Sequence, residues 1–80
     1  MSFVLTDRHI ELAERAGRTH AEAEYLMGNP GPSEPVLDEE DIRKLVFTVT
    51  GEKLDIDSDE ATFIVTAYED AYYEEWENKE

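Results

Sequence analysis

The feature that most constrains this chain is a helical spacing of apolar residues near its C-terminus. These residues recur three and four positions apart: Ala61, Ile64, Val65, Tyr68, Ala71 and Tyr72, with Trp76 at the edge of the stripe. At 100° per residue they fall within an arc of about 140°, which is the pattern of an amphipathic α-helix. Asp57 and Glu60 form a capping pattern just before the stripe. The sequence therefore predicts a helix over residues 58–77.

The N-terminal part of the chain predicts two further short helices. Thr6 is a suitable N-cap for a first helix, and Gly17 is suited to end it. Thr19 and Glu22 have the spacing of a capping box, which opens a second helix that Gly28 ends. These two helices bring the expected total to about four, so the predicted fold is a small, compact all-α bundle.

Between the two halves lies a third predicted helix, preceded by a linker. The linker covers residues 28–36, where three prolines exclude a helix. The helix begins at Asp38 as N-cap and ends at Gly51, with apolar residues at helical spacing. Residues 46–50 are rich in β-branched side chains, however, so a hairpin over residues 45–56 in a small α+β fold is the competing interpretation. Eighty residues leave room for one domain, spanning 1–80.

The charge of the chain is strongly acidic and unevenly distributed. Lys and Arg number 7 against 21 Asp and Glu, giving a net charge of −14. Residues 34–80 hold 16 of these acids, interleaved with aromatic residues, which disordered acidic segments lack. We therefore expect a folded acidic surface. A free-standing nucleic-acid binder needs a basic surface, so this composition argues against one.

Other functional classes are also restricted by the composition. The chain has no cysteine, and hence no disulfide, no thiolate metal site and no cysteine nucleophile. No apolar run approaches the ~18 residues of a membrane span, and the N-terminus lacks the layout of a signal peptide. We expect a cytoplasmic protein without a membrane partner.

Residues 11–26 resemble the helix-turn-helix of bacterial repressors. That family has a small residue in its first helix, a glycine in the turn four positions later, and Ser or Thr opening the second helix. Ala13, Gly17 and Thr19 match these positions, and Leu26 matches the apolar position near the end of the second helix. The resemblance implies a DNA-binding or regulator-like domain whose acidic half serves protein contacts.

Three side chains depart from the repressor pattern. Arg18 occupies a position that is normally buried and aliphatic, and Glu22 and Glu24 would face the phosphates of DNA. We therefore expect two packed helices joined at Gly17, and no direct binding of nucleic acid.

The acidic segment before the last helix partly resembles two known kinds of site. Residues 54–58, Leu-Asp-Ile-Asp-Ser, are similar to the attachment site of acyl carrier proteins, but only 22 residues follow the serine. The same region is similar to an EF-hand calcium loop, except that Glu60 and Thr66 stand at its glycine and glutamate positions. We expect Asp57 or Ser58 to cap the last helix instead.

The two histidines lack the spacing of metal ligands. His9 and His20 lie eleven residues apart on different predicted helices, so a surface or capping role is expected for each. The sequence thus predicts a non-enzymatic protein with no catalytic residue, no metal site and no cofactor.

Two acidic surfaces are the candidates for partner binding. The first is the outer face of the last helix, opposite its apolar stripe: Phe63, Asp70, Tyr73, Glu74 and Glu77. The second is the acidic start of the third helix: Asp38, Glu39, Glu40 and Asp41. Aromatic residues on a non-core face are candidate binding anchors. We expect these surfaces to contact a basic, nucleic-acid-binding protein or complex.

The size, charge and lack of cysteine of the chain also support this expectation. In size, charge and lack of cysteine the chain resembles the DNA-mimic inhibitors made by phages and mobile elements, including some anti-CRISPR proteins. The resemblance implies an acidic protein that occupies the nucleic-acid site of its partner. A third interpretation remains, in which the charge is that of a generic acidic domain from a salt-adapted organism.

Overall fold

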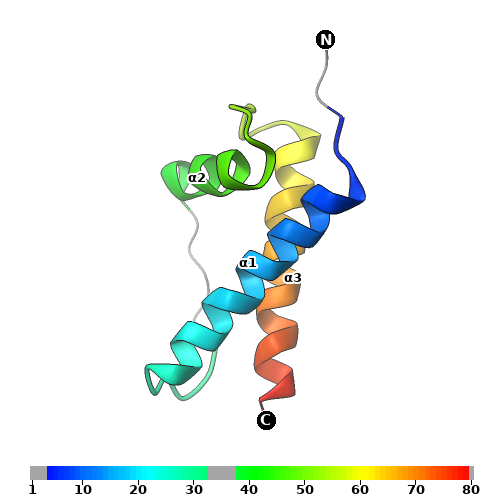
Figure 1. Ribbon diagram of the computed structural model, residues 1–80. Helices are drawn as coiled ribbons and strands as arrows, with labels where there is room; N and C mark the ends of the chain where they lie inside the picture. Colours follow the sequence, from blue (N-terminus) through cyan, green and yellow to red (C-terminus); the bar gives the residue numbers. More distant parts are fainter. Residues whose placement is uncertain (1–3, 33–37, 80) are drawn as a thin grey trace.

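Three α-helices make up the fold in the computed structural model, which describes residues 4–32 and 38–79 (Figure 1). They are α1 (Asp7–Leu26), α2 (Glu39–Thr50) and α3 (Asp59–Asn78). The described residues contain no strand, so the all-α class is confirmed and the hairpin over 45–56 is excluded. In Figure 1, α1 and α3 run in the same direction and cross, while α2 lies across their first halves.

The two expected N-terminal helices are in fact one continuous helix. α1 passes through Gly17 without a break, and Gly17 has no positive φ. Thr19 and Glu22, the predicted capping box, are exposed positions inside this helix. The prediction of four helices was therefore wrong by one, and the segment has no turn at Gly17. A helix-turn-helix is consequently absent from residues 11–26.

Close approach of two helices explains why glycine stands at position 17. A Cβ atom there would collide with the backbone carbonyl oxygen of Tyr68 and lie 3.1 Å from the backbone nitrogen of Tyr72. Ala13, Gly17 and Ala21 recur every four residues and are the buried residues of α1. Because residues four apart share a helix face, this stripe of small side chains lets α1 press against α3.

The other helix boundaries agree with the predictions. The Asp38 carboxylate accepts a hydrogen bond from the Asp41 backbone nitrogen at 2.9 Å, and Ser58 Oγ accepts one from Ala61 at 3.2 Å. Gly51 ends α2 in the left-handed region at φ 73°, where glycine has no steric cost. Within the expected linker, residues 28–32 are non-helical, and residues 33–36 lie outside the described residues.

The core is built in two parts along α3. In the first, α2 packs on the start of α3 and on α1: Ala13, Val46, Val49, Ala61 and Ile64 are buried together. The second lies further along the crossing of α1 and α3, where Ala21 packs with Tyr72 and Trp76. α1 therefore supplies small side chains and α3 supplies large ones. This division fixes which face of α3 turns to solvent.

Candidate functional site

The outer face of α3 carries five exposed side chains of the predicted surface. Phe63, Asp70, Tyr73, Glu74 and Glu77 are all exposed, as the helical spacing predicted. Phe63 keeps 60% of its surface accessible and Tyr73 keeps 37%. We call these five residues the α3 outer face. Large apolar rings are normally the first groups to be buried, so two of them among carboxylates mark this face as a candidate binding surface.

The carboxylates of the α3 outer face are not neutralised by neighbouring cations. No ion pair within the described residues involves Asp70, Glu74 or Glu77. The cation nearest in sequence is Lys79, the residue that follows α3; it pairs instead with Glu75 at 3.4 Å and lies over the ring of Tyr25. At 1.5 Å rise per residue, the three carboxylates extend over about 10 Å of the helix.

The acidic start of α2 is exposed as well, but its charge is partly compensated. Glu39 pairs with Arg43 at 3.9 Å and Glu40 with Lys44 at 3.5 Å. Asp38 accepts the backbone hydrogen bond of its own helix. The four acidic residues Asp38, Glu39, Glu40 and Asp41 are therefore a weaker candidate than the α3 outer face.

The two acidic surfaces are separate patches in the fold. α2 packs against the first half of α3, through Val46 and Ile64. The carboxylates of the α3 outer face lie in the second half of that helix, beyond α2 in Figure 1. Each patch therefore has to be tested by its own substitutions.

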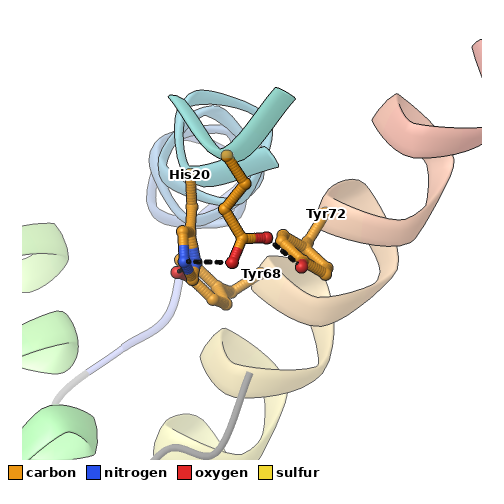
Figure 2. A network of polar contacts seen from close by, with 4 residues as sticks. His20, Tyr68 and Tyr72 are labelled. Carbon is orange, nitrogen blue, oxygen red and sulfur yellow. Dashed lines mark hydrogen bonds and ion pairs between the residues drawn. The ribbon is translucent and has the colours of Figure 1, made fainter. Parts of the chain in front are cut away.

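A network of polar side chains at the crossing of α1 and α3 was not predicted. His20 Nδ1 lies 2.5 Å from the hydroxyl of Tyr68, and His20 Nε2 lies 3.6 Å from a carboxylate oxygen of Glu24 (Figure 2). The hydroxyl of Tyr72 donates a hydrogen bond to the other oxygen of Glu24. Burial raises the pKa of Tyr68 above its usual 10.0, and the charges of Tyr72, Glu24 and Asp41 add to this rise.

This network joins the two helices that form most of the core. His20 and Glu24 are four residues apart on α1, and Tyr68 and Tyr72 are four apart on α3. The four-residue spacing within each pair is visible in the sequence, but the spacing alone does not show that the two pairs face each other. Because its polar groups satisfy one another across a half-buried interface, we assign it a structural role that fixes the register of α1 on α3.

The remaining motif residues have local structural roles. The backbone nitrogen of Thr6 donates to His9 Nδ1 at 3.0 Å, so the capping role expected for a histidine is confirmed at His9. Asp55 accepts a hydrogen bond from the backbone of Asp57, and Ser58 caps α3. The part of the chain that the structure describes holds no group of three or more His, Cys, Asp or Glu residues that is arranged to bind a metal ion.

Comparison with protein-family models, with curated proteins and with solved structures found no match to this chain. In the described ranges, no helix combines the length and the apolar character that crossing a membrane requires.

Proposed function

We propose that this chain is a non-enzymatic binding protein whose α3 outer face occupies a basic, nucleic-acid-binding surface of a partner protein. The observation that carries the proposal is the combination of two exposed rings, Phe63 and Tyr73, with three uncompensated carboxylates on one helix face. We place this activity in the cytoplasm, as a DNA mimic or as an inhibitor of the phage anti-CRISPR kind.

Electrostatics supports this type of partner. Consecutive phosphates advance about 3.4 Å along one strand of DNA. Asp70 and Glu74 are displaced by about 6 Å along α3, so a row of carboxylates competes for the same Lys and Arg side chains without matching every phosphate. A net charge of −14 also speeds the encounter with a basic partner, an effect that weakens as salt is added.

Competition with DNA tests this proposal directly. The chain is immobilised and exposed to a pool of heparin-binding proteins from a cell lysate, at about 0.15 M salt. Retained proteins are then challenged with duplex DNA or with high salt. The proposal predicts that duplex DNA releases them, because DNA and this chain would occupy the same basic site.

The same experiment separates the proposal from its alternatives. Retained proteins that stay bound in excess duplex DNA contradict the mimic. An absence of retained proteins favours the generic acidic domain of a salt-adapted organism. The helix-turn-helix alternative has lost its structural support because α1 is continuous.

A further inference from the structure

A second surface of different character lies between α1 and α2. A hollow of about 470 Å³ opens there to solvent. Its walls include Leu12, Ala16 and Ala23 from α1 and Val49 from α2. We call this hollow the α1–α2 groove. Arg15, Thr19, His20 and Thr48 complete its lining, but most of the surface exposed in it is apolar, in a chain whose exterior is dominated by carboxylates.

One edge of the groove is basic. A second hollow, of about 390 Å³, shares Leu12 and Arg15 with the first. It is lined also by Arg8, Arg18 and one carboxylate, Glu11, so its arginines outnumber its acids by three to one. Three of the seven Lys and Arg residues of the chain thus gather on one side of α1. Arg18 pairs with Glu14 at 3.7 Å, whereas no ion pair within the described residues involves Arg8 or Arg15.

We propose that the α1–α2 groove binds an acidic amphipathic helix of a partner protein. The apolar stripe of such a helix would fill the groove, and its carboxylates would meet Arg8 and Arg15 along the edge. From Leu12 to Ala23 the groove follows about 17 Å of α1, and the second hollow extends this surface to Arg8, for a total of about 22 Å or the length of a helix of about 15 residues. The bound helix would complete a bundle of four helices.

Charge complementarity favours an acidic helix over two other apolar ligands, a basic amphipathic helix and a second copy of this chain. A basic helix would meet Arg8 and Arg15 with like charges, which disfavours binding. A second copy of this chain carries its own charge of −14, so the two molecules repel each other as a whole. A short acidic helix of a partner carries less charge, and its repulsion from distant carboxylates is screened beyond about 8 Å at physiological salt.

Fluorescence anisotropy with designed peptides tests the proposal. The probe is a labelled peptide of about 15 residues with the spacing of an amphipathic helix, leucines three and four positions apart and glutamates at the other positions. A second peptide has glutamine in place of every glutamate, and a third has the leucines and glutamates in scrambled order. We expect the first peptide to bind at least about tenfold more tightly than either of the others.

Two variants assign the binding to the groove. In the first, Arg8→Gln and Arg15→Gln remove the unpaired cations, and we expect affinity for the leucine–glutamate peptide to fall about tenfold with a weaker salt dependence. The matched control, Arg43→Gln with Lys53→Gln, removes two cations elsewhere and should bind as the wild type does. In the second variant, Ala23→Glu places a carboxylate in the groove and should also weaken binding. Circular dichroism checks that each variant remains folded.

Several results would overturn the proposal. They are the absence of binding, equal binding of the glutamine peptide, and unchanged affinity in the arginine variant. Concentration-dependent self-association that the arginine variant abolishes would assign the groove to a second copy instead. Because the peptide binds on α1 and α2, these outcomes are independent of binding at the α3 outer face.

Discussion

Gly17 of α1 lies directly against the backbone of Tyr68 in α3, with no room between them for a side chain. This contact holds the two longest helices of the fold at their closest approach. It also positions the polar network around His20 and, on the opposite side of α3, turns Phe63 and Tyr73 to solvent. The exposed acidic face is therefore a consequence of the tight packing of α1 on α3.

Substitution of Gly17 by alanine should destabilise the fold. Alanine is the better helix former by about 1 kcal/mol, but its Cβ would collide with a backbone carbonyl that cannot rotate away. We expect the free energy of unfolding in urea to fall by about 1–3 kcal/mol. As a control, Glu22→Ala on the exposed side of α1 should have an effect within about 0.5 kcal/mol. A more stable Gly17→Ala variant would contradict the close contact.

The helix boundaries could be predicted because they depend on local chemistry. Asp38 and Ser58 cap helices through side-chain hydrogen bonds to residues three positions away, and Gly51 adopts a positive φ. The exposed positions of α3 follow from the period of its apolar residues in the same way. The β-branched residues within 46–50 favour a strand and so a hairpin. Burial of Val46 and Val49 in the core outweighs this weak preference for strands.

The tertiary relationships could not be predicted from local patterns. A glycine between helical segments is compatible with both a helix end and a close helix crossing, and the local pattern around Gly17 favours a helix end. The spacing of Ala13, Gly17 and Ala21 at every fourth residue was the signal for the second. The network of His20 and Tyr68 depends on how α1 and α3 are placed against each other, which their separate sequences do not specify.

The buried hydroxyl of Tyr72 should contribute to stability. Tyr72 is fully buried, and it donates a hydrogen bond to Glu24, whose side chain is only 14% exposed. Because hydrogen bonds to charged groups contribute about 1.5–3 kcal/mol, Tyr72→Phe should lower the free energy of unfolding by about that amount. Tyr73→Phe is the matched control on the exposed neighbouring residue. Equal effects of the two substitutions would show that the network is not structural.

Alkaline pH should weaken the fold through Tyr68. Its pKa is raised in the folded state, mainly by burial, so above pH 10 the unfolded chain loses this proton before the folded chain does. The folded state then binds more protons, and stability falls as the pH rises through this range. Urea unfolding between pH 8 and pH 11 should show a smaller loss of stability for Tyr68→Phe than for the wild type. An unchanged pH dependence in this variant would contradict the assignment.

Binding at the α3 outer face should depend on its two rings. Phe63→Ala and Tyr73→Ala should each weaken binding to a retained partner by about 1–3 kcal/mol, as truncation of an interface anchor does. Phe47→Ala removes a ring that is similarly exposed on α2 and serves as the control. Calorimetric titration provides the affinities. If only Phe47→Ala weakens binding, the partner contacts α2 and not the α3 outer face.

Charge reversal on α3 tests the central claim, that the uncompensated carboxylates of this helix bind the partner. The triple variant carries Asp70→Lys, Glu74→Lys and Glu77→Lys. All three side chains are exposed, so circular dichroism should show an intact fold. Because self-repulsion is reduced, the melting temperature should be unchanged or higher. A matched triple variant with Glu22→Lys, Glu52→Lys and Asp57→Lys changes the net charge by the same amount at exposed positions outside this face.

The most direct measurement is the affinity of both triple variants for one retained basic partner, as a function of salt concentration. We predict that the α3 variant loses binding, because attraction is replaced by repulsion between like charges, while the matched variant keeps most of its affinity. Wild-type affinity and salt dependence in a correctly folded α3 variant would contradict the claim. Binding would then have to lie elsewhere, with the acidic start of α2 at Asp38, Glu39, Glu40 and Asp41 as the next surface to reverse.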